Sequence, residues 1–101
     1  MKTKSQLRAK ITFLPPESGG FSRPHSSGVK PQLKVGDLFT SCFVWAAKDD
    51  QVFEPGITYD VDLELPSWAQ YGTRIYVGMP VELRDGTRIV ATGRVDAILA
   101  Q

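Results

Sequence analysis

Three carboxylates at alternate positions form the densest group of potentially reactive side chains in this sequence. Asp60, Asp62 and Glu64 lie in the alternating run TYDVDLEL, and this spacing places all three on one face of an extended strand. Paired carboxylates can act as general acid and base, and clustered ones can bind a divalent cation. Because the run has no turn glycine and no histidine to complete such a site, it predicts a solvated acidic strand face.

The chain has one cysteine and one histidine, which could serve as a nucleophile and a base. Cys42 has no basic neighbour to lower its pKa, which favours a buried, apolar role. His25 has no Asp or Cys at a defined spacing, whereas metal sites need several ligands and a catalytic base needs an orienting partner. No nucleophile elbow, zinc pattern or dinucleotide fingerprint occurs. The sequence predicts a protein that is not an enzyme and carries no metal or cofactor.

Charge is unevenly distributed along the 101 residues. Residues 1–34 contain seven Lys or Arg and one acidic residue, whereas residues 35–101 contain five Lys or Arg and ten acidic residues. The basic amino-terminal third could attract phosphates. Alternatively, a sheet could bring the two parts side by side so that their charges cancel. The sequence leaves both alternatives open.

The elements that would position these groups are strands, and the clearest is a hairpin over Pro80 to Leu99. Asp85-Gly86 lies between two alternating runs, which predicts a turn at these two positions with positive φ at both. Gly93 interrupts the second strand and would suit a bulge or bend. In that strand the residues predicted to face the core are Ile89, Ala91, Val95, Ala97 and Leu99, and those predicted to face away are Arg88, Thr92, Arg94 and Asp96.

Further segments have the alternation or the β-branched and aromatic content of strands. Residues 17–28, rich in Gly, Ser and Pro, predict a long exposed loop. About six short strands without helical periodicity are typical of an antiparallel sandwich or small barrel, and closure into a barrel would remove exposed edges. Besides the hairpin, the predicted strands are Arg8 to Leu14, Val29 to Val35, Leu38 to Ala46 and Thr58 to Leu65.

An aromatic-rich connection, residues 67–78, follows the fourth of these strands. Its Trp68, Tyr71 and Tyr76 predict either a lid over one end of the sheet or a patch that binds a partner.

The length suits one domain. We expect a flexible tail over residues 1–7 and a single domain over residues 8–101. The sequence has no apolar run long enough to span a membrane and no signal-peptide pattern, and its single cysteine agrees with a reducing compartment. These features predict a cytoplasmic protein without a membrane partner.

Three blocks occur in order along the chain: Gly19-Gly20 followed by Gly28-Val29-Lys30-Pro31-Gln32-Leu33, then Pro55-Gly56 opening an alternating strand, then Arg84-Asp85-Gly86-Thr87-Arg88 through Gly93 to Leu99. Together they resemble the carboxy-terminal β-barrel, the third domain, of elongation factor Tu and related translational GTPases. The resemblance implies a single six-stranded antiparallel β-barrel, here as a stand-alone domain. No G-x-x-x-x-G-K-[ST] motif occurs, so we expect no nucleotide binding by this chain.

In that family the barrel contacts the T stem of aminoacyl-tRNA and also binds proteins. Relatives place an Arg-His pair directly after the two glycines, where this chain has Phe21-Ser22, and a basic residue where it has Pro80. Arg23 and His25, in the same loop, are candidate replacements for the missing pair. The set of RNA- or partner-binding residues that the resemblance implies is completed by Lys30, Gln32, Ser41, Arg84, Thr87, Arg88 and Gly93.

The sequence therefore predicts a non-catalytic binding module that contacts structured, tRNA-like RNA or a translation-related protein. The alternative is a protein-interaction or regulatory module that does not bind RNA. A bland interpretation of Arg84 and Arg88 also stays open, in which they are solvated hairpin charges paired with Asp85 or Glu82. A small-ligand site at the barrel mouth is a third possibility.

Overall fold

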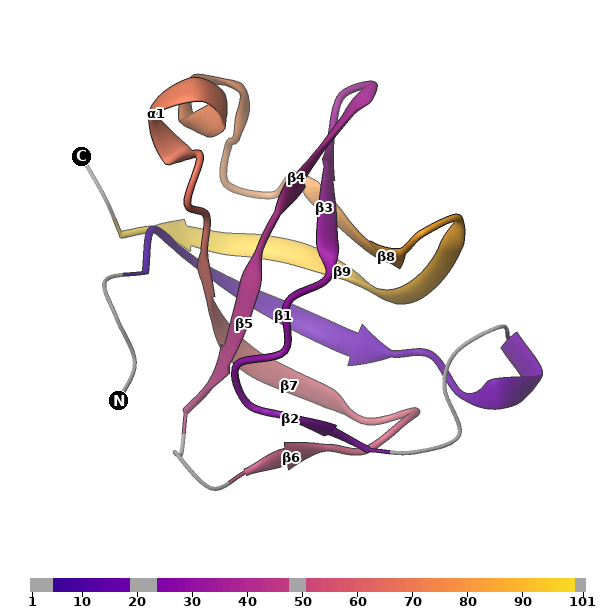
Figure 1. Cartoon of the computed structure of the whole chain (residues 1–101). Helices are drawn as coiled ribbons and strands as arrows, with labels where there is room; N and C mark the ends of the chain where they lie inside the picture. Colours follow the sequence, from indigo (N-terminus) through magenta and orange to yellow (C-terminus); the bar gives the residue numbers. More distant parts are fainter. Residues whose placement is uncertain (1–4, 19–23, 48–50, 100–101) are drawn as a thin grey trace.

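The chain folds mostly into β-structure: a strongly curled, seven-stranded antiparallel sheet and a small two-stranded sheet (Figure 1). The computed structural model describes residues 5–18, 24–47 and 51–99. The main sheet has the order β4-β3-β8-β9-β1-β7-β5, and β2 pairs with β6. The strands are β1 (Leu7–Phe13), β2 (His25–Ser26), β3 (Gln32–Val35), β4 (Leu38–Ser41), β5 (Phe43–Ala46), β6 (Val52–Phe53), β7 (Thr58–Glu64), β8 (Pro80–Asp85) and β9 (Arg88–Ile98).

The strand predicted over residues 38–46 is divided at Cys42. Its first half, β4, pairs with β3, and its second half, β5, pairs with β7, so the two ends of the sheet order are consecutive in the chain. The Cys42 amide donates to the carbonyl of Pro31 (N to O 3.0 Å), and its side chain is fully buried. Burial raises the pKa of the thiol. The predicted buried, apolar role of Cys42 is confirmed.

Strand boundaries differ from the predictions where the chain bends. β1 begins at Leu7, one residue before the predicted Arg8; the Leu7 side chain is buried, and Gln6 hydrogen-bonds Leu65 and Leu99. β3 begins only at Gln32; of the earlier residues in the predicted strand, Val29 forms an isolated bridge with Val44. The predicted loop, residues 17–28, contains the end of a 3₁₀ turn, η1 (Pro16–Ser18), and the strand β2.

The core is formed by the inward faces of the curled sheet, as the alternation predicts. In β1 and β7 the predicted inward positions are buried or, for Tyr59, half-buried, while the charged positions between them face out. The largest fully buried side chains are Phe13, Phe53, Leu7, Ile11, Leu33, Leu63, Leu65 and Leu83.

The predicted hairpin forms, but its turn is displaced by one residue. β8 ends at Asp85 and β9 begins at Arg88, so the loop is Gly86-Thr87 rather than Asp85-Gly86. Of the two loop residues only Gly86 has a positive φ (65°), and no described non-glycine residue has one. Glycine at the first of two loop positions is the arrangement of a type II′ turn, which needs positive φ only there.

β9 contains two irregularities, which change the predicted faces. Val90 is left out of the residue pairing between β9 and β8, and Asp96 is left out of the pairing between β9 and β1. Each is therefore the extra residue of a bulge. Val90 is therefore buried beside Ala91, and Leu99, predicted to face the core, is 41% exposed. Gly93 lies between the bulges rather than in one, in register with β1 and β8.

The aromatic connection forms a short helix, α1 (Trp68–Tyr71), and a 3₁₀ turn, η2 (Gly72–Arg74), at the opposite end of the sheet from β2 and β6 (Figure 1). The helix was not predicted, because one turn is too short to give a repeat. Trp68 and Tyr71 pack against the core as a lid would, whereas Tyr76 is 58% exposed. In the described residues, no helix has the length and hydropathy needed to cross a bilayer.

Candidate functional site

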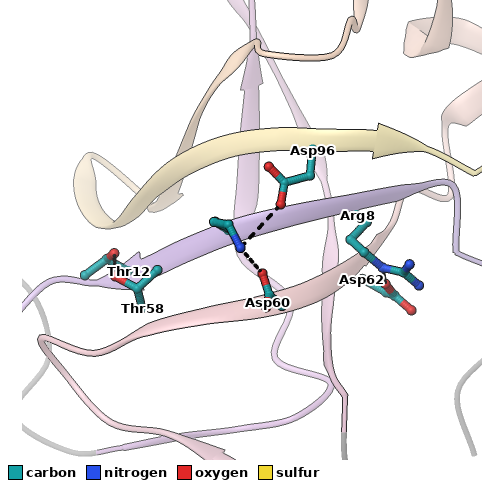
Figure 2. A network of polar contacts seen from close by, with 7 residues as sticks. Arg8, Thr12, Thr58, Asp60, Asp62 and Asp96 are labelled. Atoms are coloured by element: carbon teal, nitrogen blue, oxygen red, sulfur yellow. Dashed lines mark hydrogen bonds and ion pairs between the residues drawn. The ribbon is translucent and has the colours of Figure 1, made fainter.

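Ion pairs cover the acidic face of β7. Arg8 Nε lies 3.1 Å from Asp62 Oδ1 and Lys10 Nζ lies 2.6 Å from Asp60 Oδ1, while Asp96 Oδ2 lies 3.8 Å from the same ammonium (Figure 2). The hydrogen bond to Asp60 raises the pKa of Lys10. The basic start of the chain and its acidic second part are thus neighbours in the sheet, and on this face their charges cancel.

Neighbouring side chains engage all three carboxylates that could have acted in catalysis or metal binding. Asp60 and Asp62 bind cations of β1, and Glu64 Oε1 accepts a hydrogen bond from Trp45 Nε1 at 2.9 Å. Within residues 5–18, 24–47 and 51–99, no group of three or more His, Cys, Asp or Glu side chains could hold a metal ion. Structurally, these carboxylates hold neighbouring strands to β7.

Three of the predicted contact residues come together in one line on the outside of the sheet. Gln32 on β3 is in register with Ser41 on β4 and with Arg84 on β8. Gln32 and Ser41 are exposed and Arg84 is half-buried. We call Ser41, Gln32 and Arg84 the polar row. It presents a hydroxyl, an amide and a guanidinium across three adjacent strands.

Arg84 is held in place by two neighbours. Its Nε donates to Glu82 Oε2, two residues earlier on β8, and its guanidinium lies 5.1 Å from the ring centroid of Phe39 on β4. Phe39 is 39% exposed, and Leu38 beside it is 44% exposed. The expected pairing of Arg84 with Glu82 is confirmed. A guanidinium stacked on a ring is preorganised to present its remaining N–H groups.

The hairpin loop extends this surface beyond the polar row. Thr87 and Arg88 are exposed, and Arg88 lies 4.0 Å from Asp85, a separation that gives only a weak, solvated ion pair. Asp85 directly follows Arg84 in the chain. Successive strand residues point to opposite faces, so Arg88, which is in register with Asp85, lies at the hairpin tip beside the row and not in line with Arg84.

Two further predicted residues, His25 and Lys30, line a cavity beside the hairpin. We call it the hairpin cavity; its volume is about 180 Å³. His25 stacks on Phe13 with 5.0 Å between ring centroids, and Lys30 lies over the ring of Phe43 at 5.5 Å. The lining residues are Phe13, His25, Val29, Lys30, Pro31, Asp85 and Val90.

His25 is neutral in most of the physiological range. Burial lowers its pKa below the ordinary 6.5, and the charge of Asp85 opposes this to a smaller extent. A neutral imidazole stacked on an aromatic ring agrees with a packing role in the wall of the cavity.

Acidification is expected to destabilise the protein more than it destabilises the His25→Gln variant. Because the folded-state pKa is lowered, the unfolded chain binds the proton first; the His25 contribution is complete above about pH 6.5 and is lost as the pH falls below it. Urea-unfolding midpoints between about pH 7.5 and 5.5 test this. Identical pH dependence in the two proteins would contradict it, and carboxylate protonation, common to both, cancels in the comparison.

Gly93 lies apart from the polar row, and its lack of a side chain has a structural reason. A Cβ at this position would lie 1.8 Å from the carbonyl oxygen of Lys10. The glycine thus allows the close approach of β1. Gly93 also lines an open depression on the outer face with Lys10, Arg94 and three threonines, two of which, Thr12 and Thr58, are hydrogen-bonded at 2.6 Å (Figure 2).

Some predicted positions lie outside the description, and some site residues were not predicted. Arg23, Phe21-Ser22 and Gly19-Gly20 lie outside the described residues. Phe39 and Asp85 belong to the site but were not predicted as contact residues. Phe39 had a sequence signal, an aromatic residue on the polar face of a strand, whereas Asp85 had only its turn position.

A search of protein-family models finds none that matches this chain.

Proposed function

We propose that this protein is a non-catalytic module that binds the sugar–phosphate backbone of structured RNA. The observation that carries the proposal is the polar row, a hydroxyl, an amide and a guanidinium aligned across three strands next to the exposed Thr87 and Arg88. Groups of these types contact phosphates and sugars without reading bases, and arginine can bind phosphate through two hydrogen bonds.

The sheet topology supports a finer fold assignment of the translation-factor type. Because β4 and β5 are consecutive and lie at the two ends of the sheet order, counting them as one bent strand leaves six strands in a ring. A six-stranded antiparallel barrel of this kind is what the resemblance to the third domain of elongation factor Tu implies, and RNA backbone contact is the corresponding function. Both parts of this assignment belong to the proposal.

Titration with a fluorescently labelled tRNA transcript tests the function. We expect binding that weakens steeply between about 50 and 200 mM salt, because phosphate contacts release counterions. Replacing Arg84 and Arg88 by alanine together is expected to weaken binding about tenfold or more and to reduce the salt slope by about two, roughly one per phosphate contact.

Arg74→Ala provides the matched control, since Arg74 is exposed on η2 near the α1 end of the sheet. It is expected to bind as the unchanged protein does. No binding at the lower salt concentration, or equal affinity in the double variant and the control, would rule out the proposed function. Circular dichroism of each variant verifies that the sheet is intact.

A second candidate function is recognition of a protein partner, and exposed apolar side chains favour it. Tyr76 and Val77 are 58% and 61% exposed at consecutive positions. A protein complex centred there would tolerate salt, survive nuclease treatment and be lost in the variant Tyr76→Ser with Val77→Ser, whereas the double arginine variant would retain it. A complex that nuclease abolishes would contradict this candidate.

A further inference from the structure

The outward side chains of β4 and β5 form one line, although Cys42 divides the two strands. Residues 40, 42, 44 and 46 are buried, so the residues between them face outward. Figure 1 shows β4 and β5 following one continuous path. Apart from Ser41, the outward residues of this line are all aromatic: Phe39, Phe43 and Trp45.

Cations lie beside the first two of these rings. Lys34 on β3 is in register with Phe39. Backbone hydrogen bonds continue this register beyond the start of β3, which places Lys30 opposite Phe43, and the Lys30 Nζ lies 5.5 Å from the centroid of that ring. The guanidinium of Arg84 lies 5.1 Å from the centroid of Phe39. We call the three rings and three cations together the aromatic track.

The charge of the track suits a polyanion. Residues 28–46 contain two lysines, both in the track, and one acidic residue, Asp37, which lies at the exposed turn between β3 and β4. In the part of the chain that the structure describes, no carboxylate forms an ion pair with Lys30 or Lys34. Both ammonium groups can therefore meet a phosphate.

The rings are partly open, and Trp45 is fixed from two sides. Its Nε1 donates to Glu64 Oε1, and a Cβ added to Gly28 would lie 3.0 Å from the indole, so only glycine lets the backbone lie this close. The indole also stacks on Phe43, with 6.0 Å between centroids. Phe39 is 39% exposed, and the other two rings are half-buried. Rings held in this way lose little freedom when a ligand stacks on them.

The spacing of the line suits an extended nucleic-acid strand. Successive outward residues of a strand are about 7 Å apart, which is about twice the roughly 3.4 Å rise per nucleotide of a stacked strand. Each ring can therefore receive its own base. Proteins bind unpaired strands in this way, with bases on aromatic rings and cations along the backbone, and a guanidinium plane is a further stacking surface.

The polar row crosses the track on the same face of the sheet. Ser41 lies in the line between Phe39 and Phe43, Gln32 is in register with it, and Arg84 belongs to both sets. A strand whose sugars and phosphates contact the row would therefore have its bases beside the rings.

We propose that the aromatic track binds an unpaired segment of the RNA, with bases stacked on Phe39, Phe43 and Trp45. The phosphates of this segment lie beside the three cations. The inference rests on the proposed RNA-backbone function and adds to it the RNA element that is recognised, an unpaired strand that continues from a paired one. Because every base has a stacking face, we expect little dependence on its sequence.

Quenching of tryptophan fluorescence tests the stacking directly. The chain has two tryptophans, so Trp68→Phe leaves Trp45 as the single emitter and keeps an aromatic ring in α1. We expect a single-stranded RNA of six nucleotides to quench this emission, and an abasic strand of the same length and charge to leave it unchanged. Equal effects of the two strands, or no effect of either at about 50 mM salt, would overturn the inference.

Loss of two rings tests the affinity. Phe39→Leu combined with Phe43→Leu keeps apolar side chains but removes the stacking surfaces, and should weaken binding of the six-nucleotide strand about tenfold or more. Tyr71→Leu, which removes a half-buried ring on α1, is the matched control and should bind as the unchanged protein does. Phe39→Leu alone changes an exposed position that the fold tolerates, and should weaken binding about fivefold. Unchanged affinity in the single and double variants would overturn the inference.

An RNA hairpin with an overhang of six nucleotides, compared with the blunt hairpin and with an abasic overhang, separates this inference from the proposed function. We expect the complete overhang to bind about tenfold more tightly than either control. If all three bind equally and with a steep salt dependence, the track does not bind bases and the backbone function stands. If the blunt hairpin does not bind while the single strand binds and quenches Trp45, the track is supported and the backbone function fails.

Discussion

Replacing Gly93 by alanine is expected to lower the free energy of unfolding by at least about 3 kcal/mol, a large part of the roughly 5–15 kcal/mol that stabilises a typical domain. The new Cβ would lie 1.8 Å from the Lys10 carbonyl oxygen and 2.9 Å from Ile11 Cδ1. The first of these atoms is backbone in the centre of the β1–β9 ladder, where Ile11 is in register with Gly93. It cannot withdraw without breaking hydrogen bonds between the two strands.

Urea unfolding measures this effect, and Gly36→Ala is the matched control. Gly36 has a positive φ (62°), but a Cβ added there would have no neighbouring atom within 4 Å, so its substitution costs only the conformational strain. That strain amounts to about 1–2 kcal/mol for a left-handed residue. An equal loss of stability in the two variants would show that the close approach of β1 does not determine the requirement for glycine at Gly93.

Replacing Phe13 by alanine is expected to cost about 3–5 kcal/mol, the range for large aromatic side chains in cores. Phe13 is 1% exposed and its ring lies between those of His25 and Phe53. Its removal leaves a void at the end of β1 and merges it with the hairpin cavity, which Phe13 also lines. The stability of the domain and the shape of the candidate site thus depend on the same ring.

The control for this variant is Phe39→Ala, which removes a phenylalanine that is 39% exposed on the outer face. Its cost in urea unfolding is expected to stay below about 1 kcal/mol, because it loses mainly the contact with Arg84. A loss for Phe13→Ala no larger than for Phe39→Ala would contradict the assignment of Phe13 as a central core residue.

The two predictions also separate the scaffold from the site. Gly93→Ala acts on the β1–β9 pairing, away from the polar row, and should reduce RNA binding only as far as it unfolds the protein. The double alanine variant of Arg84 and Arg88 should do the reverse, because Arg84 contacts only Glu82 and the partly exposed Phe39 ring outside the core, and Arg88 forms a weak, solvated ion pair. If the double arginine variant unfolded more easily than the unchanged protein but bound RNA equally well, the outer face would have a structural rather than a binding role.

Local patterns in the sequence were sufficient to predict the strands and their inward faces. Alternation has a period of two residues, so β1, β7 and the hairpin could be identified from neighbouring residues alone. The predictions were wrong where an extra residue breaks that period. Val90 and Asp96 each interrupt the register of β9, and the turn lies one residue beyond the predicted Asp85-Gly86. Bulges and turn types depend on how two strands pair, which one strand does not encode.

The sequence by itself determined a mostly β chain, the core-facing residues of the strands without bulges and the buried role of Cys42, because burial follows from the apolar pattern of each segment. Only the tertiary structure decided between a basic face and charge cancellation, since the Lys10–Asp60 and Arg8–Asp62 pairs join residues of separate strands. It also decided that Gln32, Ser41 and Arg84 share one row and that four distant segments enclose a cavity. The physical reason is that strand register and sheet curvature, which bring distant residues together, depend on contacts summed over the whole core rather than on any local pattern.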